Sequence, residues 1–558
     1  MLEKTIHAAA HAAWLASCWA PYHSLRRAQK NPAAAQAALL DRLLRANASS
    51  AYGREFGFGR LRTVREFQRA VPIVGYDDLR PWIERIKGGE ERVLTEEPVL
   101  MLEKTSGSST AAKYIPYTSS LRREFQRGVG AWIFDLYVHN PKLVYGTAYW
   151  AITPMAREPE VTAGGLRVGF ENDTEYLGAA ERFLLRKILA VPEEVARIPE
   201  LDTALYVTLR FLLQSPSLRF ISVWAPSFLT ILLEHLQNNV ERLLTDLGEG
   251  TLRPPGSVSD EIAPALHKCL RADPARARRL EHVWRKYGLL PTKEVWPNLG
   301  VISCWTDASS RLAVPALQEL FPGVHIQGKG LLATEGVVSV PLVEHGSSVA
   351  AATSHFYEFM EKPDATPRLL HELEANHEYS ALLTTGGGLY RYRLGDRVRV
   401  VGFARNTPLL EFLGKEDGIS DLCGEKLSPA FVGSVLAELS GERAYSSDFA
   451  MLAPSQQESS RYVLFLQGSG AQPDLAVRLD EKLTRNPHYA YCRRLGQLAA
   501  PGIFQIKSDA GECYLRRCVA MGQRAGAVKT VALHRLTGWE DFFRGEWTEH
   551  HAKHEVEA

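Results

Sequence analysis

Apolar residues recur every three or four positions in several stretches of the first 140 residues, and this spacing predicts helices. The longest stretch runs from Thr118 to Tyr137, with apolar side chains on one stripe. The stripe consists of Leu121, Phe125, Val129, Trp132, Ile133 and Leu136. Shorter helices are expected over residues 36–46, 63–70 and 76–86. An amphipathic helix is expected over the alanine-rich residues 8–20.

Short apolar runs bounded by polar residues predict strands. They lie at residues 98–102, 220–223, 301–305 and 331–340, with several more between 380 and 413. Strands that alternate with helices over some 410 residues are typical of one large α/β domain rather than several small ones. The fold class expected from this pattern is therefore α/β.

The pattern changes near residue 415 to short helices and strands. We therefore expect a large α/β domain at 1–412 and a smaller α+β domain at 419–558. The polar, glycine-flanked stretch from Gly414 to Gly418 is the candidate hinge, placed at 413–418.

Composition narrows the class of protein. The chain has 558 residues, and 45% are hydrophobic, so disorder is excluded as the dominant state. Its 65 Lys and Arg balance 64 Asp and Glu, whereas a nucleic-acid-binding protein would carry a basic excess. No apolar run approaches the roughly 18 residues that span a bilayer. We expect no nucleic-acid partner and no membrane span.

The seven cysteines are scattered and form no C-x-x-C pair. This arrangement indicates reduced thiols in a cytoplasmic protein rather than a disulfide scaffold or zinc ribbon. The stretch from Ala8 to Ala20 resembles the core of a signal peptide, but it contains His11 and lacks a basic leader. An amphipathic helix is the preferred interpretation.

The strongest local motif is the hydroxyl-rich loop from Thr105 to Lys113. Hydroxyls and backbone N–H groups in a glycine-containing turn can surround phosphate oxygens, and Lys113 can neutralise them. A plain serine-rich loop is the alternative. The predicted position of the loop, between a strand and an amphipathic helix, favours the phosphate site.

Several other motifs are weaker. Residues 323–330 nearly spell a phosphate-binding P-loop, but Gly330 occupies the position that needs a hydroxyl, and an extended segment follows. Asp396 is predicted at a strand end beside a glycine, where it could bind ribose hydroxyls or simply form a turn. His371 and His377 have the wrong spacing for a zinc helix, and no G-x-S-x-G elbow supports a serine hydrolase.

Taken in order, further segments resemble the adenylate-forming superfamily, and within it the auxin-responsive-type acyl-acid amido synthetases. The resemblance spans nearly the whole chain. Besides the hydroxyl-rich loop, it includes residues 52–58, 71–76, 296–299, 332–336, 389–396 and 420–427. The fold implied is a large N-terminal adenylate-forming α/β domain with a smaller mobile C-terminal α+β domain.

The resemblance implies roles for individual residues. Ser106, Gly107, Ser108, Ser109 and Lys113 match the phosphate loop, with Ala333 and Lys415 as further nucleotide-site residues. Thr334 matches the hydroxyl on the α-phosphate, Glu335 the carboxylate beside Mg²⁺, and Asp396 the ribose-binding aspartate. Lys529 is the candidate lysine of the small domain that reaches the α-phosphate. Trp224, Ser227 and Phe228 could line the acyl pocket, or simply pack in the core.

The chain departs from the family pattern at three positions. Thr110 replaces a usual glycine, Ala112 a usual proline, and Leu331 a tyrosine that stacks on adenine in many relatives. The implied activity joins a small carboxylic acid to the amine of an amino acid with ATP and Mg²⁺, through an acyl-adenylate, and no carrier-protein domain is expected in the chain. Two alternatives stay open. One is thioester formation with coenzyme A, and the other is a silent nucleotide-binding relative.

Overall fold

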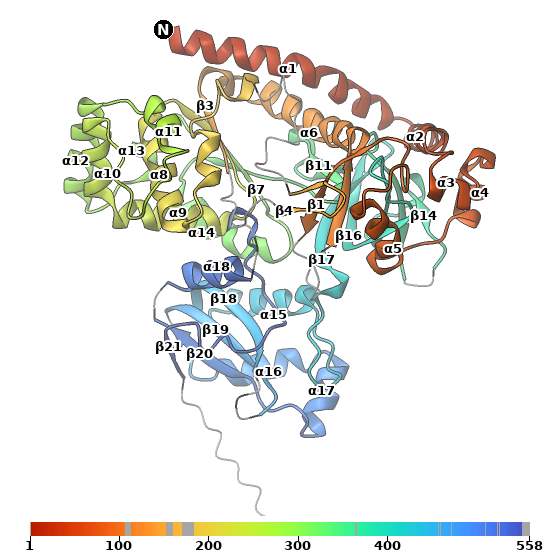
Figure 1. Ribbon diagram of the computed structural model, residues 1–558. Coiled ribbons are helices and arrows are strands. Elements are labelled where there is room, and N and C mark those ends of the chain that lie inside the picture. Colours follow the sequence, from red (N-terminus) through yellow and green to blue (C-terminus); the bar gives the residue numbers. More distant parts are fainter. Residues whose placement is uncertain are drawn as a thin grey trace, which may run out of the picture. The chain divides into compact units, whose positions relative to one another are not determined.

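The computed structural model divides into two compact units (Figure 1). Unit 1 comprises residues 1–224, 228–307 and 318–413, and unit 2 comprises 225–227, 308–317 and 414–558. The residues that the structure describes are 2–105, 113–151, 160–169, 183–362, 365–455, 457, 459–469, 471–507, 509–521, 523 and 525–548.

Unit 1 begins with helices whose starts are set by side-chain caps. Thr63 accepts the N–H of Glu66 at 3.2 Å, while the Glu66 carboxylate accepts the Thr63 N–H, a reciprocal pair that satisfies two helix-end donors. Thr118 caps the long predicted helix by accepting the Leu121 N–H. These helices are α1 (Leu2–Ala28), α2 (Pro32–Ala46), α3 (Ala51–Glu55), α4 (Val64–Ala70), α5 (Tyr76–Lys87) and α6 (Ser119–His139). The predicted helices are therefore confirmed. The helix expected at 8–20 is much longer than predicted, since α1 spans Leu2–Ala28.

A four-stranded parallel sheet has the strand order β3-β6-β7-β8. Its strands are β3 (Thr147–Trp150), β6 (Leu218–Ser222), β7 (Val301–Cys304) and β8 (His325–Gly328). Parallel neighbours need crossover connections, and helices supply them here. The helices of this region are α8 (Leu201–Gln214), α9 (Pro226–Asn238), α10 (Val240–Glu249), α11 (Ala263–Cys269), α12 (Pro274–Tyr287), α13 (Thr292–Val295) and α14 (Val314–Leu320).

A seven-stranded sheet has the order β11-β12-β17-β16-β15-β13-β14. Its strands are β11 (Ser339–Pro341), β12 (Ser348–Ala350), β13 (Phe356–Met360), β14 (Arg368–Leu369), β15 (Glu378–Thr384), β16 (Tyr392–Ala404) and β17 (Thr407–Lys415). Strand β15 pairs antiparallel with both β13 and β16, and its residues 379–384 are all buried. The β-like runs predicted between 380 and 413 are thus strands of one sheet.

Among the described residues, unit 1 has two further, smaller sheets. The first has the order β2-β1-β5-β4, with β1 (Val99–Thr105), β2 (Lys113–Thr118), β4 (Glu160–Val161) and β5 (Arg167–Val168). The second is a hairpin of β9 (Leu332–Ala333) and β10 (Gly336–Val337). The single strand predicted over 331–340 is therefore wrong, because β9, β10 and β11 share that range.

Unit 2 is built on a four-stranded sheet of mixed direction, with the order β18-β19-β20-β21. Its elements are β18 (Ser446–Ser455), β19 (Arg461–Ser469), β20 (Gly502–Ile506), β21 (Gly545–Trp547), α15 (Pro429–Gly441), α16 (Leu475–Leu483), α17 (Pro487–Arg494) and α18 (Ala510–Ala520). Leu436, Leu464 and Leu479 from α15, β19 and α16 share one buried cluster. The predicted α/β fold class is confirmed.

The seven cysteines are all free thiols, as their spacing predicts. Among the described residues, no helix has the length and hydropathy that crossing a bilayer requires.

Helix α1 carries a histidine whose burial makes unit 1 sensitive to acid. The His11 side chain is 1% exposed and contacts the Gly146 carbonyl through Nε2 at 3.0 Å. Burial lowers the pKa of His11 to about 4, against the opposing effect of that hydrogen bond. The unfolded chain therefore takes up a proton near pH 6.5, whereas the folded protein takes it up only near pH 4.

We predict that the free energy of unfolding falls between pH 6.5 and 4 by up to about 1.4 kcal/mol per pH unit from this group. His11→Gln preserves an N–H donor for Gly146 and cannot titrate, so it should flatten the profile. Urea denaturation at pH 7, 6 and 5 measures the effect, with exposed His325→Gln as control. An unchanged slope in His11→Gln would contradict the prediction.

Candidate functional site

Thr334 and Glu335 form the tip of the β9–β10 hairpin. Ala333 pairs with Gly336 and Leu332 with Val337, so only these two residues lie between the strands. Glu335 is 7% exposed, and Thr334 and Ala333 are half-buried. The hairpin thus presents a hydroxyl beside a mostly buried carboxylate at a sharp turn.

The hydroxyl-rich loop joins two strands. Its residues Ser106, Gly107, Ser108 and Ser109 lie outside the described part of the chain. Strand β1 enters the loop and β2 leaves it, and Thr105 pairs antiparallel with Lys113. The predicted strand–loop–helix order is therefore wrong, because β2 comes between the loop and α6. Ile115 and Tyr117 of β2 are buried, and pairing with β1 satisfies the backbone.

Lys113 is half-buried at the start of β2, directly after the loop. On the same strand pair, the Tyr114 N–H donates to the Tyr76 hydroxyl at 2.8 Å. The strand pair therefore fixes the backbone of Lys113. The phosphate-binding role of the loop stays a prediction.

Asp396 lies within β16 (Tyr392–Ala404), so the predicted position at a strand end is wrong. Ser380 pairs with Arg397 and Leu382 with Arg393, so residues 394–396 lie opposite the single residue Ala381. This is a β-bulge, and Gly395 at its centre has a φ of 75°. Asp396 is 2% exposed. A bulge redirects side chains out of the regular ladder and often occurs next to active sites.

Arg391 lies directly before β16 and is 4% exposed. Its guanidinium forms two hydrogen bonds with the Glu358 carboxylate, at 2.9 and 2.8 Å. It also donates to the carbonyls of Gln68 and Val71, each at 2.7 Å. Both side chains are nearly inaccessible, at 5% and 1%. Arg391 therefore has a structural role that joins the segment before α5 to β13.

The predicted acyl-pocket residues follow β6. The Trp224 ring is half-buried and packs against Trp305, with centroids 5.4 Å apart. The Lys329 ammonium lies over the Trp224 ring at 5.2 Å from its centroid and donates to Ser222 Oγ. Phe228 is 5% exposed, which favours a packing role for this residue. Ser227 belongs to unit 2 and is half-buried.

Lys415 and Lys529 belong to unit 2. Lys415 is exposed at the last position of β17, next to Gly414, whose φ is 137°. Lys529 is half-buried, and its backbone carbonyl accepts the Tyr514 hydroxyl at 2.8 Å. Both candidate cationic residues are therefore at least partly exposed to solvent.

Glu425 organises the motif that follows the candidate hinge. Its carboxylate accepts the N–H groups of Leu422 and Cys423 at 2.7 and 2.8 Å, and the Tyr462 hydroxyl. Burial alone would raise the pKa of Glu425, but these hydrogen bonds hold it below its usual value. The carboxylate thus fixes the turn that carries Lys426.

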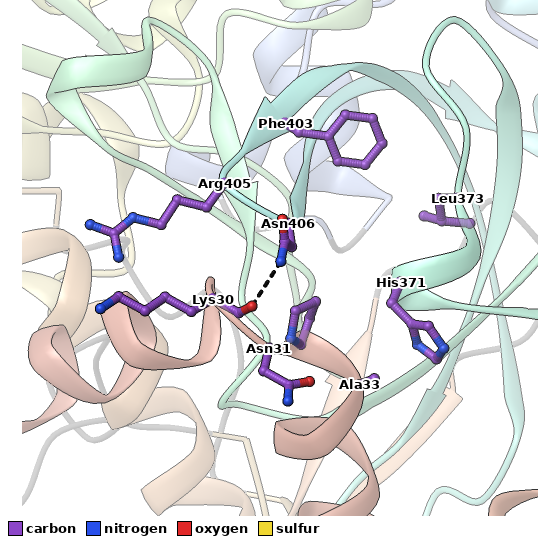
Figure 2. Close-up of a pocket in the computed structure, with 9 residues that line it drawn as sticks. Lys30, Asn31, Ala33, His371, Leu373, Phe403, Arg405 and Asn406 are labelled. Carbon is purple, nitrogen blue, oxygen red and sulfur yellow. Dashed lines mark hydrogen bonds between the residues drawn. The ribbon is translucent and has the colours of Figure 1, made fainter.

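A surface pocket of about 660 Å³ lies where the joint between α1 and α2 meets the β16–β17 turn (Figure 2). Lys30, Arg405 and His371 are among its lining residues, and Asn406 donates to the Lys30 carbonyl at 2.8 Å. None of the predicted site residues lines this pocket. It is therefore separate from the candidate site.

Two buried polar residues next to the hairpin, Glu124 and His355, are not predicted from the sequence. Glu124 is 2% exposed on α6 and His355 is fully buried. The signal for Glu124 is a carboxylate between Leu121 and Phe125 on the apolar stripe, because a buried charge needs a partner. Nothing local in the sequence marks His355.

Three family models match the chain in order. The model of the GH3 family N-terminal domain matches residues 21–326, that of the GH3 family central domain 348–415, and that of the GH3 family C-terminal domain 431–536.

Curated relatives align over most of their length. A protein of Oryza sativa subsp. japonica described as a probable indole-3-acetic acid-amido synthetase is 26% identical, over 90% of this chain and 91% of its own. A jasmonoyl-L-amino acid synthetase of Nicotiana attenuata is 24% identical, over 88% and 89%.

Solved structures share the fold. An acyl acid amido synthetase in complex with 2,4-DB superposes with a TM-score of 0.80 at 20% identity, covering 93% of this chain and 94% of its own. A 2-hydroxyisobutyryl-CoA ligase superposes with a TM-score of 0.53 at 12% identity, covering 87% and 89%. These similarities show the adenylate-forming fold.

Replacing Arg391 tests its structural role. We predict that Arg391→Met lowers the free energy of unfolding by about 3–5 kcal/mol, because it leaves the Glu358 carboxylate buried without its ion pair. The double variant Arg391→Met, Glu358→Leu should recover much of the loss, because no charge remains buried. Urea denaturation of the single and double variants measures both effects. Equal losses in the two variants would contradict the role.

Proposed function

Because the chain belongs to the GH3 family, we propose that it is an ATP-dependent acyl-acid amido synthetase. It activates a small carboxylic acid as an acyl-adenylate, releases pyrophosphate, and transfers the acyl group to the amine of an amino acid. The observation that carries the proposal is the match of family models to all three family domains. The amido synthetases among the relatives support it over most of the chain.

The chemistry explains why ATP is required. A carboxylate is a poor acylating agent at neutral pH, because its carbonyl is electron-rich and its leaving group is very poor. Attack of the carboxylate on the α-phosphate of ATP makes AMP the leaving group. An uncharged amine then attacks the acyl carbonyl, forms the amide bond and displaces AMP. Neither step needs a covalent enzyme nucleophile, in agreement with the lack of a nucleophile motif in the sequence.

The main obstacle is charge, since an anionic nucleophile must approach an anionic triphosphate. We assign Lys113 and the loop residues Ser106–Ser109 to the phosphates, and Thr334 to the α-phosphate. Asp396 accepts the ribose hydroxyls. Lys529 stabilises the negative charge that develops on the α-phosphate during adenylation. A preorganised donor of this kind contributes on the order of 3 kcal/mol to catalysis, about a hundredfold in rate.

The hairpin tip suits a magnesium ion. Mg²⁺ prefers oxygen ligands and is commonly held by one or two carboxylates together with substrate phosphates. Glu335 offers a carboxylate that is 7% exposed, at a sharp turn beside the Thr334 hydroxyl. When bound, Mg²⁺ would neutralise charge on the triphosphate. Glu335 would hold it.

The free thiols of the chain support a cytoplasmic location for the enzyme. Its partners under this proposal are small molecules, namely ATP, a carboxylic acid and an amino acid. Of the three predicted pocket residues, Trp224 and Ser227 are half-buried and Phe228 is buried, so we assign contact with the acyl group to Trp224 and Ser227 rather than Phe228.

ATP–pyrophosphate exchange tests the proposal. We predict that exchange depends on a carboxylic acid, in a panel that includes indole-3-acetic, jasmonic and simple aryl acids. With an amino acid present, mass spectrometry should detect the conjugate. A thioester formed with coenzyme A in place of the conjugate would contradict amide synthesis. No exchange with any acid would contradict adenylation.

The two half-reactions separate the role of Lys529. We predict that Lys529→Ala lowers acid-dependent exchange about a hundredfold, because a cation on the α-phosphate is lost. Aminolysis of a synthetic acyl-adenylate should proceed at close to the wild-type rate. The matched control is Lys507→Ala, which removes an exposed lysine paired with Glu546 in the same unit. Equal losses in both half-reactions would overturn the assignment.

A further inference from the structure

The base of the β9–β10 hairpin is held by two side chains from one neighbouring segment. The Val337 N–H donates to His355 Nε2 at 2.9 Å. The Val337 carbonyl accepts the Tyr357 hydroxyl at 2.6 Å. Val337 is only two residues after Glu335, so side-chain hydrogen bonds fix the main chain next to the tip.

These contacts determine which ring nitrogen of His355 carries the proton. Because Nε2 accepts a hydrogen bond, the ring hydrogen is on Nδ1, and the imidazole is neutral. Nδ1 donates to Glu124 Oε2 at 2.8 Å. The imidazole is therefore a rigid bridge between the carboxylate of α6 and the backbone of the hairpin.

Glu124 also holds a third segment. Its Oε2 accepts the Gly386 N–H at 2.8 Å. The Gly386 carbonyl accepts the hydroxyl of Thr118, the N-cap of α6, at the same distance. Thr118 is the last residue of β2, the strand that starts with Lys113. The carboxylate thus connects α6, the hairpin and the triglycine turn at 386–388.

The packing leaves no space for the hairpin to shift toward α6. A Cβ added at Gly336 would lie 2.8 Å from His355 Nε2, and one at Gly128 would lie 2.8 Å from Val337 Cγ1. From α6, Arg127 donates to the carbonyls of Thr353 and Ser354, at 2.8 and 3.2 Å. The segment that carries His355 is therefore itself anchored on α6.

We propose that Glu124 and His355 are a pair of positioning residues that set the Thr334–Glu335 tip in place for adenylation. The inference rests on the proposed function for the role of the tip. His355 contacts only the backbone beside the tip and acts through it. Because a misplacement of about 1 Å can cost a hundredfold in rate, a clamp on this backbone controls how well the tip meets the phosphates.

Two substitutions of His355 separate clamping from simple core packing. In His355→Gln the side-chain oxygen can reach the position of Nε2 and accept the Val337 N–H. In His355→Asn the shorter amide can reach Glu124 but not Val337. Both variants lose one of the two hydrogen bonds in the buried site. His11→Gln, at a similarly buried histidine of unit 1, is the matched control.

Hydrogen exchange and kinetics read the effect independently. In His355→Asn we expect amide exchange in a peptide spanning 331–339 to rise at least tenfold. We also expect kcat for acid-dependent pyrophosphate exchange to fall about a hundredfold, and the Mg²⁺ concentration for half-maximal rate to rise severalfold. His355→Gln should keep hydrogen exchange near wild type and kcat within tenfold. His11→Gln should alter neither hydrogen exchange in this peptide nor the Mg²⁺ requirement.

Unchanged hydrogen exchange in His355→Asn would overturn the clamp. Equal kcat losses in the Asn and Gln variants, with an unchanged Mg²⁺ requirement, would reduce His355 to a packing residue and overturn the proposal. If the wild-type protein shows no exchange of pyrophosphate with any acid, the proposed function fails instead. Hydrogen exchange then decides the clamp by itself.

Discussion

The buried carboxylate of Glu124 on α6 is the constraint on which the arrangement of the candidate site in unit 1 depends. A buried carboxylate is costly unless donors surround it, and here the donors come from His355 and Gly386. These donors lie 231 and 262 residues further along the chain, so Glu124 is satisfied only when distant segments pack against α6. The need of this buried carboxylate for donors therefore links α6 to the hairpin that carries Thr334 and Glu335.

A buried ion pair between Arg391 and Glu358 meets the same need for partners elsewhere in unit 1. The Arg391 guanidinium donates to the Glu358 carboxylate on β13 and to two backbone carbonyls before α5. The pair thus joins β13 to that backbone. The net charge of +1 conceals such pairs, because opposite charges cancel in the sum. The charges that matter in this protein are local.

Periodicity predicted the helices well, because a stripe such as that of Leu121, Phe125 and Leu136 depends on neighbours three or four residues away. The ordered motifs predicted the family and the fold. Local patterns could not predict β2, because its strand character depends on pairing with β1. The burial of Arg391 and the role of His355 depend on partners far along the chain. The individual site residues stay predictions until they are tested by substitution.

The bulge in β16 has a consequence for changes of chain length. Three residues of β16 lie opposite the single residue Ala381, two more than in a regular ladder. Because side chains alternate between the two faces of a strand, an excess of two leaves the same face toward the core. Val398 and Val400 therefore stay buried after the bulge, as Tyr392 is before it. An insertion or deletion of one residue at 394–396 would move the core-facing side chains of the rest of the strand to the opposite face. Change in length at this place is tolerable only in steps of two.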